Sequence, residues 1–138
     1  MLAQAGVSVG VNIAPVIPGL TDEEIPKIVS RAAAAGAQFI GMTPLRLPYA
    51  VKSLFEEWLA THRPDRKDKI LNRIRAMRDG KLNDAHFGSR MEGTGIFADQ
   101  MHQLFLIACK RAGIVSDGPT LSTAHFRRRK ETQLKLFV

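Results

Sequence analysis

The chain has 138 residues, of which 45% are hydrophobic, so its composition suits one folded domain and excludes a disordered polypeptide. The formal net charge is +7, and a surface of that charge attracts polyanions, of which nucleic acid is the commonest. No apolar stretch approaches the roughly 20 residues that span a bilayer, and residues 1–5 lack the features of a signal peptide. With a single cysteine, Cys109, a disulfide framework is excluded and a cytoplasmic location is expected, with no membrane partner.

The excess positive charge is concentrated in two segments. One lies between Arg63 and Lys81, and the other is the run of residues 127–130. Either segment could hold DNA or RNA through phosphate contacts, or it could be a solvated basic surface without a partner. No base-reading motif accompanies them. The basic residues of the first segment are Arg63, Arg66, Lys67, Lys69, Arg73, Arg75, Arg78 and Lys81.

The first 13 residues predict the end of a helix followed by a strand. Residues 1–6 are typical of a last helical turn that Gly6 ends, and the body of that helix is missing. The alternation over residues 7–13 predicts a strand, with valine and isoleucine on one face and Ser8, Gly10 and Asn12 on the other. A small, polar face suits a barrel interior that leaves room for a ligand. We therefore expect a piece of a larger barrel protein.

The next segments predict a β–α–β unit. Residues 14–20 are expected to form a loop, Thr21 and Glu24 a capping box, and residues 25–35 a helix that ends at Gly36. A second strand is predicted over residues 38–43. This order predicts parallel pairing. Because a parallel sheet of two strands is not stable alone, we expect the missing strands to lie upstream.

Three helices are predicted beyond Pro48. They cover residues 51–59, 65–79 and 96–112, with a glycine-rich loop over residues 80–95. The first helix is expected to bury one apolar stripe, and the second to turn its basic residues outward. The stripe consists of Val51, Leu54, Phe55, Trp58 and Leu59. This pattern divides the chain into a barrel portion (1–47), a helical extension (48–115) and a basic, flexible tail (116–138).

Few residues carry recognisable chemistry. No spacing of Cys and His could hold zinc or an iron–sulfur cluster, and no catalytic residue is predicted. Cys109 lies on an apolar helix face, which indicates a core thiol. The informative segment is Val11 to Asp22, where a strand ends directly before a helix. Ligands bind at that edge of parallel α/β folds, and free helix amides there favour an anion; an ordinary turn is the alternative.

Several segments, in this order, resemble a known family. They are Pro15-Val-Ile-Pro-Gly-Leu-Thr-Asp22, Leu45-Arg-Leu-Pro48, Leu54-Phe-Glu-Glu-Trp-Leu59, the stretch from Leu82 to Met91, and the ending from Gln133 to Phe137. Together they resemble the C-terminal half of bacterial radical S-adenosylmethionine (SAM) proteins similar to spore photoproduct lyase, often labelled DNA repair photolyases. The resemblance covers nearly the whole chain.

The resemblance implies an α/β fold: the last two parallel strands of a partial (β/α)6 radical SAM barrel, plus a helical C-terminal extension. Its chemistry is the cleavage of SAM by a 4Fe–4S cluster, held on a Cys-x3-Cys-x2-Cys motif in the N-terminal half. That motif is absent from this sequence, so the chain alone cannot hold the cluster and its own enzymatic activity stays open. The missing half is an implied partner.

The resemblance also implies roles for single residues of this chain. Asn12, Pro15, Gly19 and Thr43 would line the cofactor pocket. Arg46, just past a strand, would meet an anionic group of the substrate, which the family label suggests is nucleic acid; a surface ion pair is the alternative.

The C-terminal peptide suggests a second partner. Gln133, Leu134, Leu136 and Phe137 resemble the peptide by which bacterial repair and replication proteins bind the sliding clamp, although Lys135 departs from the usual Ser or Asp. A peptide that orders on binding could bury its apolar side chains in a groove. The alternative is that these residues pack onto the domain. The rival to the enzyme hypothesis is therefore a non-catalytic nucleic-acid or clamp-binding module.

Overall fold

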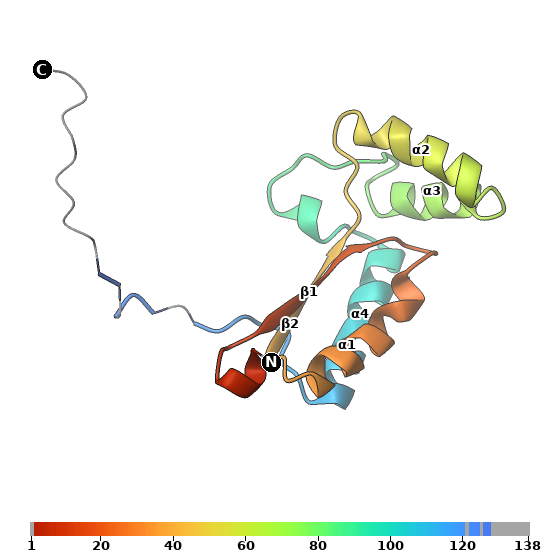
Figure 1. Ribbon diagram of the computed structural model, residues 1–138. Coiled ribbons are helices and arrows are strands. Elements are labelled where there is room, and N and C mark those ends of the chain that lie inside the picture. Colours follow the sequence, from red (N-terminus) through yellow and green to blue (C-terminus); the bar gives the residue numbers. More distant parts are fainter. Residues whose placement is uncertain (1, 121, 125, 128–138) are drawn as a thin grey trace, which may run out of the picture.

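A two-stranded parallel sheet with helices on one side forms the centre of the computed structural model (Figure 1). The structure describes residues 2–120, 122–124, 126 and 127. Its main elements are β1 (Gly10–Val16), α1 (Ile25–Ala34), β2 (Phe39–Pro44), α2 (Val51–His62), α3 (Lys67–Ala76) and α4 (Ile96–Ala112). Short 3-10 turns lie at η1 (Ala3–Ala5), η2 (Asp22–Glu24) and η3 (Ser89–Met91). The α/β class is confirmed.

The sheet has one partnered edge and one free edge. β1 and β2 pair in parallel with Gly10 opposite Phe39, which confirms the predicted β–α–β unit. The far edge of β2 is extended by Val115, whose carbonyl accepts from the Ile40 amide at 2.9 Å. Within the described residues, no strand pairs with the outer edge of β1.

β1 lies further along the chain than its alternation predicted. Val7 is exposed and outside the strand, and the strand continues across Pro15, in the segment expected to be a loop. Proline is tolerated there because β1 is an edge strand, whose outward groups need no ladder partner. The register shifts between Ile13 and Val16, and the loop begins only at Ile17.

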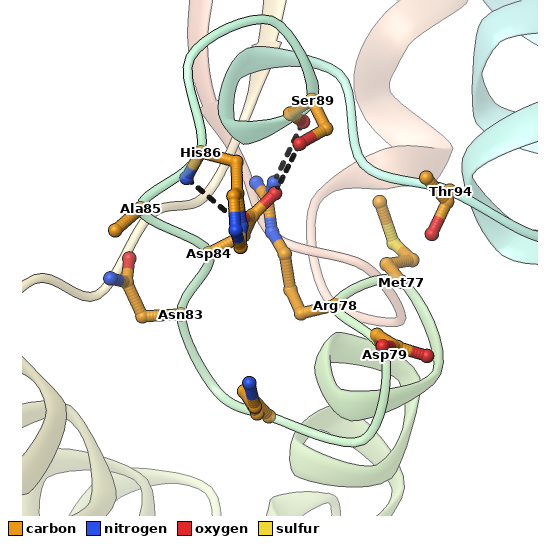
Figure 2. A pocket seen from close by; sticks show the side chains of 10 residues that line it. Met77, Arg78, Asp79, Asn83, Asp84, Ala85, His86, Ser89 and Thr94 are labelled. Atoms are coloured by element: carbon orange, nitrogen blue, oxygen red, sulfur yellow. Dashed lines mark hydrogen bonds and ion pairs between the residues drawn. The ribbon is translucent and has the colours of Figure 1, made fainter.

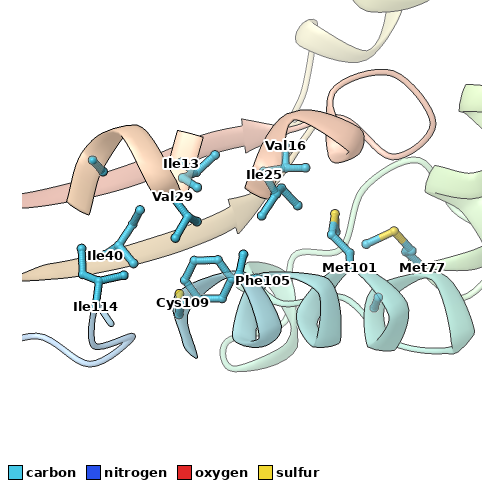
Figure 3. Close-up of a cluster of buried hydrophobic side chains, with 13 residues drawn as sticks. Ile13, Val16, Ile25, Val29, Ile40, Met77, Met101, Phe105, Cys109 and Ile114 are labelled. Atoms are coloured by element: carbon cyan, nitrogen blue, oxygen red, sulfur yellow. The ribbon is translucent and has the colours of Figure 1, made fainter. Parts of the chain in front are cut away.

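The first hydrophobic core lies between one face of the sheet and the helices α1 and α4 (Figure 3). Ile25 and Val29 of α1 are fully buried in it, as the apolar stripe predicted. Cys109 is buried in the same core, in line with a core thiol. α4 belongs by sequence to the expected helical extension, yet it shares this core with the β–α–β unit. The buried members are Ile13, Val16, Ile25, Val29, Ala32, Ile40, Met77, Ala98, Met101, Phe105, Ala108, Cys109 and Ile114.

The capping box predicted before α1 is wrong. The Thr21 hydroxyl accepts from the Ile17 amide at 2.8 Å and makes no cap hydrogen bond to the helix. A 3-10 turn comes first, and α1 begins only at Ile25, with Pro26 in its first turn. Proline suits that place because the first helical amides have no partner inside the helix.

The second core lies between α2, α3 and the segments that lead into them. Its buried members are Leu47, Leu59, Ile70, Leu71, Ile74 and Leu82. The predicted inner face of α3 is confirmed, but the predicted burial of the α2 stripe is wrong. Only Leu59 of that stripe is buried and Phe55 is half-buried, whereas Leu54 is 62% exposed and Trp58 42% exposed. The reason is that α3 is the one helix of the described chain that packs closely on α2, so much of the apolar face of α2 stays uncovered.

The ends of the described chain are short and irregular. The turn η1 ends at Gly6, which adopts a left-handed conformation with φ of 76°, as its role as a helix stop predicted. Residues 116–120 form neither helix nor strand. Among the described residues no helix is long and apolar enough to cross a membrane.

Candidate functional site

One face of the sheet is bare. Gly10, Asn12 and Ala14 are exposed there, and Figure 1 shows α1 and α4 together on the opposite face. The Phe39 ring lies directly over Gly10, so any side chain at that position would collide with it. Beside it, the side-chain oxygen of Asn12 lies 3.3 Å from where a Cβ on Gly41 would stand. Beyond the Phe39 ring, this face carries the small residues Ala14 and Gly41 and the amide side chain of Asn12.

The structure brings together only part of the predicted cofactor set. The register places Asn12 opposite Gly41, and Thr43, two residues further along β2, shares that face. Pro15 is exposed near the end of β1. Gly19 instead lies in the following loop against α3, where a Cβ would stand 3.1 Å from Cδ of Arg73. Its φ of 85° also favours glycine.

The amide of Gly19 is not free to hold a ligand. It donates to the Asp22 carboxylate at 2.9 Å, and the same oxygen accepts from Arg73 Nη1 at 3.3 Å. Glu23 and Glu24 add further negative charge at the start of α1. An anion at this helix terminus would therefore meet carboxylates first, which disfavours the anion site expected there.

Arg78 is the centre of a second candidate region, the loop of residues 82–95. The side chain was expected to face solvent with the other basic residues, and that expectation is wrong: Arg78 is 4% exposed. It donates to the carbonyl oxygens of Leu45 at 3.3 Å, Ser89 at 3.3 Å and Arg90 at 2.9 Å. Burial lowers the pKa of Arg78, and Asp84 opposes that shift. Arg78 thus fixes the loop against the chain leaving β2.

Asp84 joins two other polar side chains of this loop (Figure 2). Its carboxylate accepts from the Ser89 hydroxyl at 2.6 Å and from the amide of His86 at 2.8 Å, and His86 Nδ1 lies 2.8 Å away. These hydrogen bonds, that from Ser89 above all, hold the pKa of Asp84 far below its usual range. The group lines a hollow of about 390 Å³. Sequence reasoning missed it; the Asp-x-His spacing in a glycine-rich loop was the available signal.

The hydrogen-bond partners of Asp84, His86 and Ser89 limit the chemistry that these three side chains can perform. The Asp84 carboxylate lies 2.8 Å from His86 Nδ1 and so fixes the imidazole, whose side chain is 85% exposed. The Ser89 hydroxyl, however, donates to Asp84 and not to His86, so the three do not form a nucleophile with an adjacent base. No group of three or more metal-binding side chains exists within the described residues. The hydrogen bonds primarily fix the shape of the loop.

Arg46 lies beside this loop, as the residue after β2 and Leu45. Its Nη1 is 3.5 Å from Sδ of Met91, and its Nε is buried without a hydrogen-bond partner. The surface ion pair considered as the alternative role for Arg46 is not found among the described residues.

A third candidate region is the cationic surface of α3 and its approaches. Apart from Arg78, every basic residue of the first basic segment, Arg63 to Lys81, is exposed or partly exposed. Three of them, Arg66, Lys69 and Arg73, line one hollow of about 450 Å³ with the Gly19 loop. Arg73 is paired with Asp22, and Arg66 makes a loose, exposed pair of 3.8 Å with Asp65. Such an exposed pair is weak and leaves Arg66 open to other anions.

The remaining predicted positions fall outside the described residues. They are the peptide residues Gln133, Leu134, Leu136 and Phe137, and the basic residues 128–130. Comparison of the chain with protein-family models, with curated protein sequences and with solved structures finds no match.

Proposed function

We propose that this chain serves as the last β–α–β portion of a radical SAM barrel, whose cluster-bearing half is supplied by another stretch of polypeptide. The observation that carries the proposal is the half-covered sheet. Parallel strands are normally covered on both faces, yet here the face with Asn12 is bare and the outer edge of β1 is unpaired within the described residues. A second set of barrel strands would pair with that edge and enclose that face.

The described residues fit one of the family's two cofactors and not the other. The iron–sulfur cluster does not fit, because Cys109 is the chain's one cysteine and is buried in the first core. SAM, which supplies the adenosyl group in this family, fits better: beyond the Phe39 ring, Gly41 leaves space over this face of the sheet, and Asn12 offers an amide donor and acceptor there. In this proposal Asn12, Pro15 and Thr43 bind and orient the cofactor, and Arg46 meets an anionic part of the substrate.

Reconstitution with a separate cluster-bearing half tests this function. The probe is the N-terminal half of a radical SAM protein similar to spore photoproduct lyase, loaded with its cluster. Mixed with this chain and a reductant, it should co-elute on size exclusion and release more 5′-deoxyadenosine from SAM than it does alone. Gly41→Val should reduce both effects by crowding Asn12, whereas Gly118→Val, at an open position, should not. Failure of the two polypeptides to associate at micromolar concentrations would refute the proposal.

Binding of nucleic acid is a second candidate, favoured by the α3 surface. Seven of the eight basic residues between Arg63 and Lys81 are at least partly exposed. Arg66 and Arg73 each pair with an aspartate, and the other five exposed residues have no acidic partner among the described residues. Phosphates would replace the counterions of these side chains, and the released ions would drive binding.

Salt dependence tests this second function. Affinity for DNA should fall steeply as salt rises, with a log–log slope that becomes smaller by about one unit when Lys69 is changed to Gln. The matched control is Lys27→Gln on α1, an exposed position remote in sequence from the cluster. Binding that ignores salt, or no binding at low salt, would exclude this function.

A further inference from the structure

The chain's single tryptophan stands beside the cationic surface rather than inside a core. Trp58 is 42% exposed on α2, and its ring is stacked with Phe55 at a centroid distance of 6.1 Å and an interplanar angle of 12°. The His62 ring, one turn further along α2, also lies next to Trp58, with 5.4 Å between the ring centroids. Phe55 is anchored in the second core, so it holds the indole in place while much of the indole remains accessible. This is a rigid aromatic surface without a partner in the described chain.

Cations lie next to this aromatic surface. Trp58, His62 and Arg63 line one hollow of about 450 Å³ together with Leu20, Thr21 and Glu24. A second hollow, with Arg66, Lys69 and Arg73, is lined by Gly19, Asp22 and Glu23 from the same segment after β1. The Arg66 amide donates to the Arg63 carbonyl at 3.1 Å, so the tight turn between α2 and α3 brings Arg63 of the first hollow close to Arg66 of the second.

The acidic residues of these hollows set where a polyanion can lie. Glu24 lines the aromatic hollow, whereas Asp22 and Glu23 line the cationic hollow, where Asp22 is already paired with Arg73. Arg63 and Lys69 make no ion pair within the described residues. Phosphates are therefore favoured at the cations of the α2–α3 turn and the start of α3, whereas the Glu24 carboxylate repels them from the aromatic hollow and leaves it for an uncharged group.

An uncharged planar group flanked by phosphates is an unpaired nucleobase. Bases stack on aromatic side chains in sequence-tolerant binding of single strands, while cations follow the backbone. A base inside a duplex cannot offer its face in this way. We propose that Trp58 and His62 form a stacking site for single-stranded nucleic acid, with Arg63, Arg66 and Lys69 contacting its phosphates. The proposal rests on the nucleic-acid function above and specifies its substrate class.

The intrinsic fluorescence of Trp58 tests the site directly, since the chain has no other tryptophan. The probes are 12-residue oligo(dT), oligo(U) and a DNA duplex of equal length, added to the full chain at low salt. We expect both single strands to quench Trp58 at saturation and the duplex to leave most of the signal. A difference between oligo(dT) and oligo(U) distinguishes DNA from RNA as the preferred strand.

Variants supply the second measurement, read as anisotropy of a labelled oligo(dT). Trp58→Ala should weaken binding about 5- to 150-fold, the loss expected for one stacked base. Leu54→Ala is the matched control: it lies on the same helix, is more exposed than Trp58 and lines neither hollow, so binding should not change. Circular dichroism checks that each variant is folded, and the quenching of the unaltered chain needs no variant at all.

The outcomes separate this site from the general function. Salt-sensitive binding without quenching, and without an effect of Trp58→Ala, would overturn the stacking site and leave the phosphate-binding function intact. Equal quenching by the duplex would also overturn it. So would a dimer, seen by sedimentation, that forms through Trp58, because a second copy would then be the occupant of this surface. The absence of any binding at low salt would overturn both proposals.

Discussion

The described part of the chain has two cores, and they differ in what covers them. The first core is built from the sheet, α1 and α4, and thirteen buried residues fill it. No described helix covers the opposite face of that sheet. The second has six buried residues under α2 and α3, and there the outer helix face is left uncovered. Both regions therefore leave one surface uncovered among the described residues: a sheet face with Asn12 in the first, an aromatic and cationic helix face in the second.

The largest expected effect is loss of packing in the first core. Phe105 is buried at its centre, and Phe105→Ala should lower the free energy of unfolding by about 3–5 kcal/mol through lost burial and a residual cavity. Urea denaturation followed by circular dichroism measures this. Ile107→Ala, exposed on the same helix, should change stability by less than about 0.5 kcal/mol. Equal effects of the two would show that the first core does not hold the chain together.

A change in the smaller core should sharpen the comparison. Leu59→Ala should cost about 2–5 kcal/mol, and the loss should fall first on α2 and α3, because Leu59 contacts only their core. Trp58 fluorescence reports this region and circular dichroism the whole chain. In Leu59→Ala we expect the midpoint of the fluorescence transition to lie at a lower urea concentration than the midpoint of the circular dichroism transition. Coincident transitions would mean that the two cores unfold as one unit. Val51→Ala, exposed on the same helix, is the control.

Arg78 bonds the chain after β2 to the 82–95 loop, which leads from the second core to α4 of the first. Arg78→Met keeps the length of the side chain but leaves buried carbonyl groups unpaired, which should cost roughly 1–3 kcal/mol. Arg75→Met, whose partner Asn72 is exposed, should cost far less. Chemical denaturation of both variants checks this. A neutral Arg78→Met would contradict the role given to Arg78.

The smallest effect is a pH dependence that arises from Asp84. Its pKa is depressed in the folded chain by the hydrogen bonds from Ser89 and His86, so the carboxylate stabilises the fold above its unfolded pKa of about 3.9. That stabilisation should be lost as the pH falls below this value toward the folded pKa. Asp84→Asn should flatten the pH dependence of unfolding between about pH 5 and pH 2.5. An unchanged profile would show that the Asp84 hydrogen bonds do not form in solution.

Local patterns predicted the β–α–β unit and α4 well. The stripe from Ile25 to Ala33, the stops at Gly6 and Gly36, and the bounds of α4 follow from periodicity and glycine placement, which act within a few residues. The parallel pairing followed from the order of elements.

What could not be predicted depends on contacts between distant segments. Trp58 and Leu54 are exposed because few other segments pack on α2. The apolar periodicity of a single helix does not predict how many segments will cover it. The burial of Arg78 depends on carbonyl groups 11 to 33 residues away. The Thr21 hydroxyl could accept a hydrogen bond from the start of α1 or from the loop after β1, and it accepts from the Ile17 amide of that loop.

Hydrogen exchange at β1 tests the half-covered sheet most directly. In dilute solution, the amides of β1 that face its free edge should exchange quickly, while those of the α4 interior exchange slowly. Adding the cluster-bearing half of a radical SAM protein similar to spore photoproduct lyase should slow the fast β1 amides and leave α4 unchanged. Uniformly slow exchange along β1 in the chain alone would contradict the account, as would fast exchange that persists once a complex has formed.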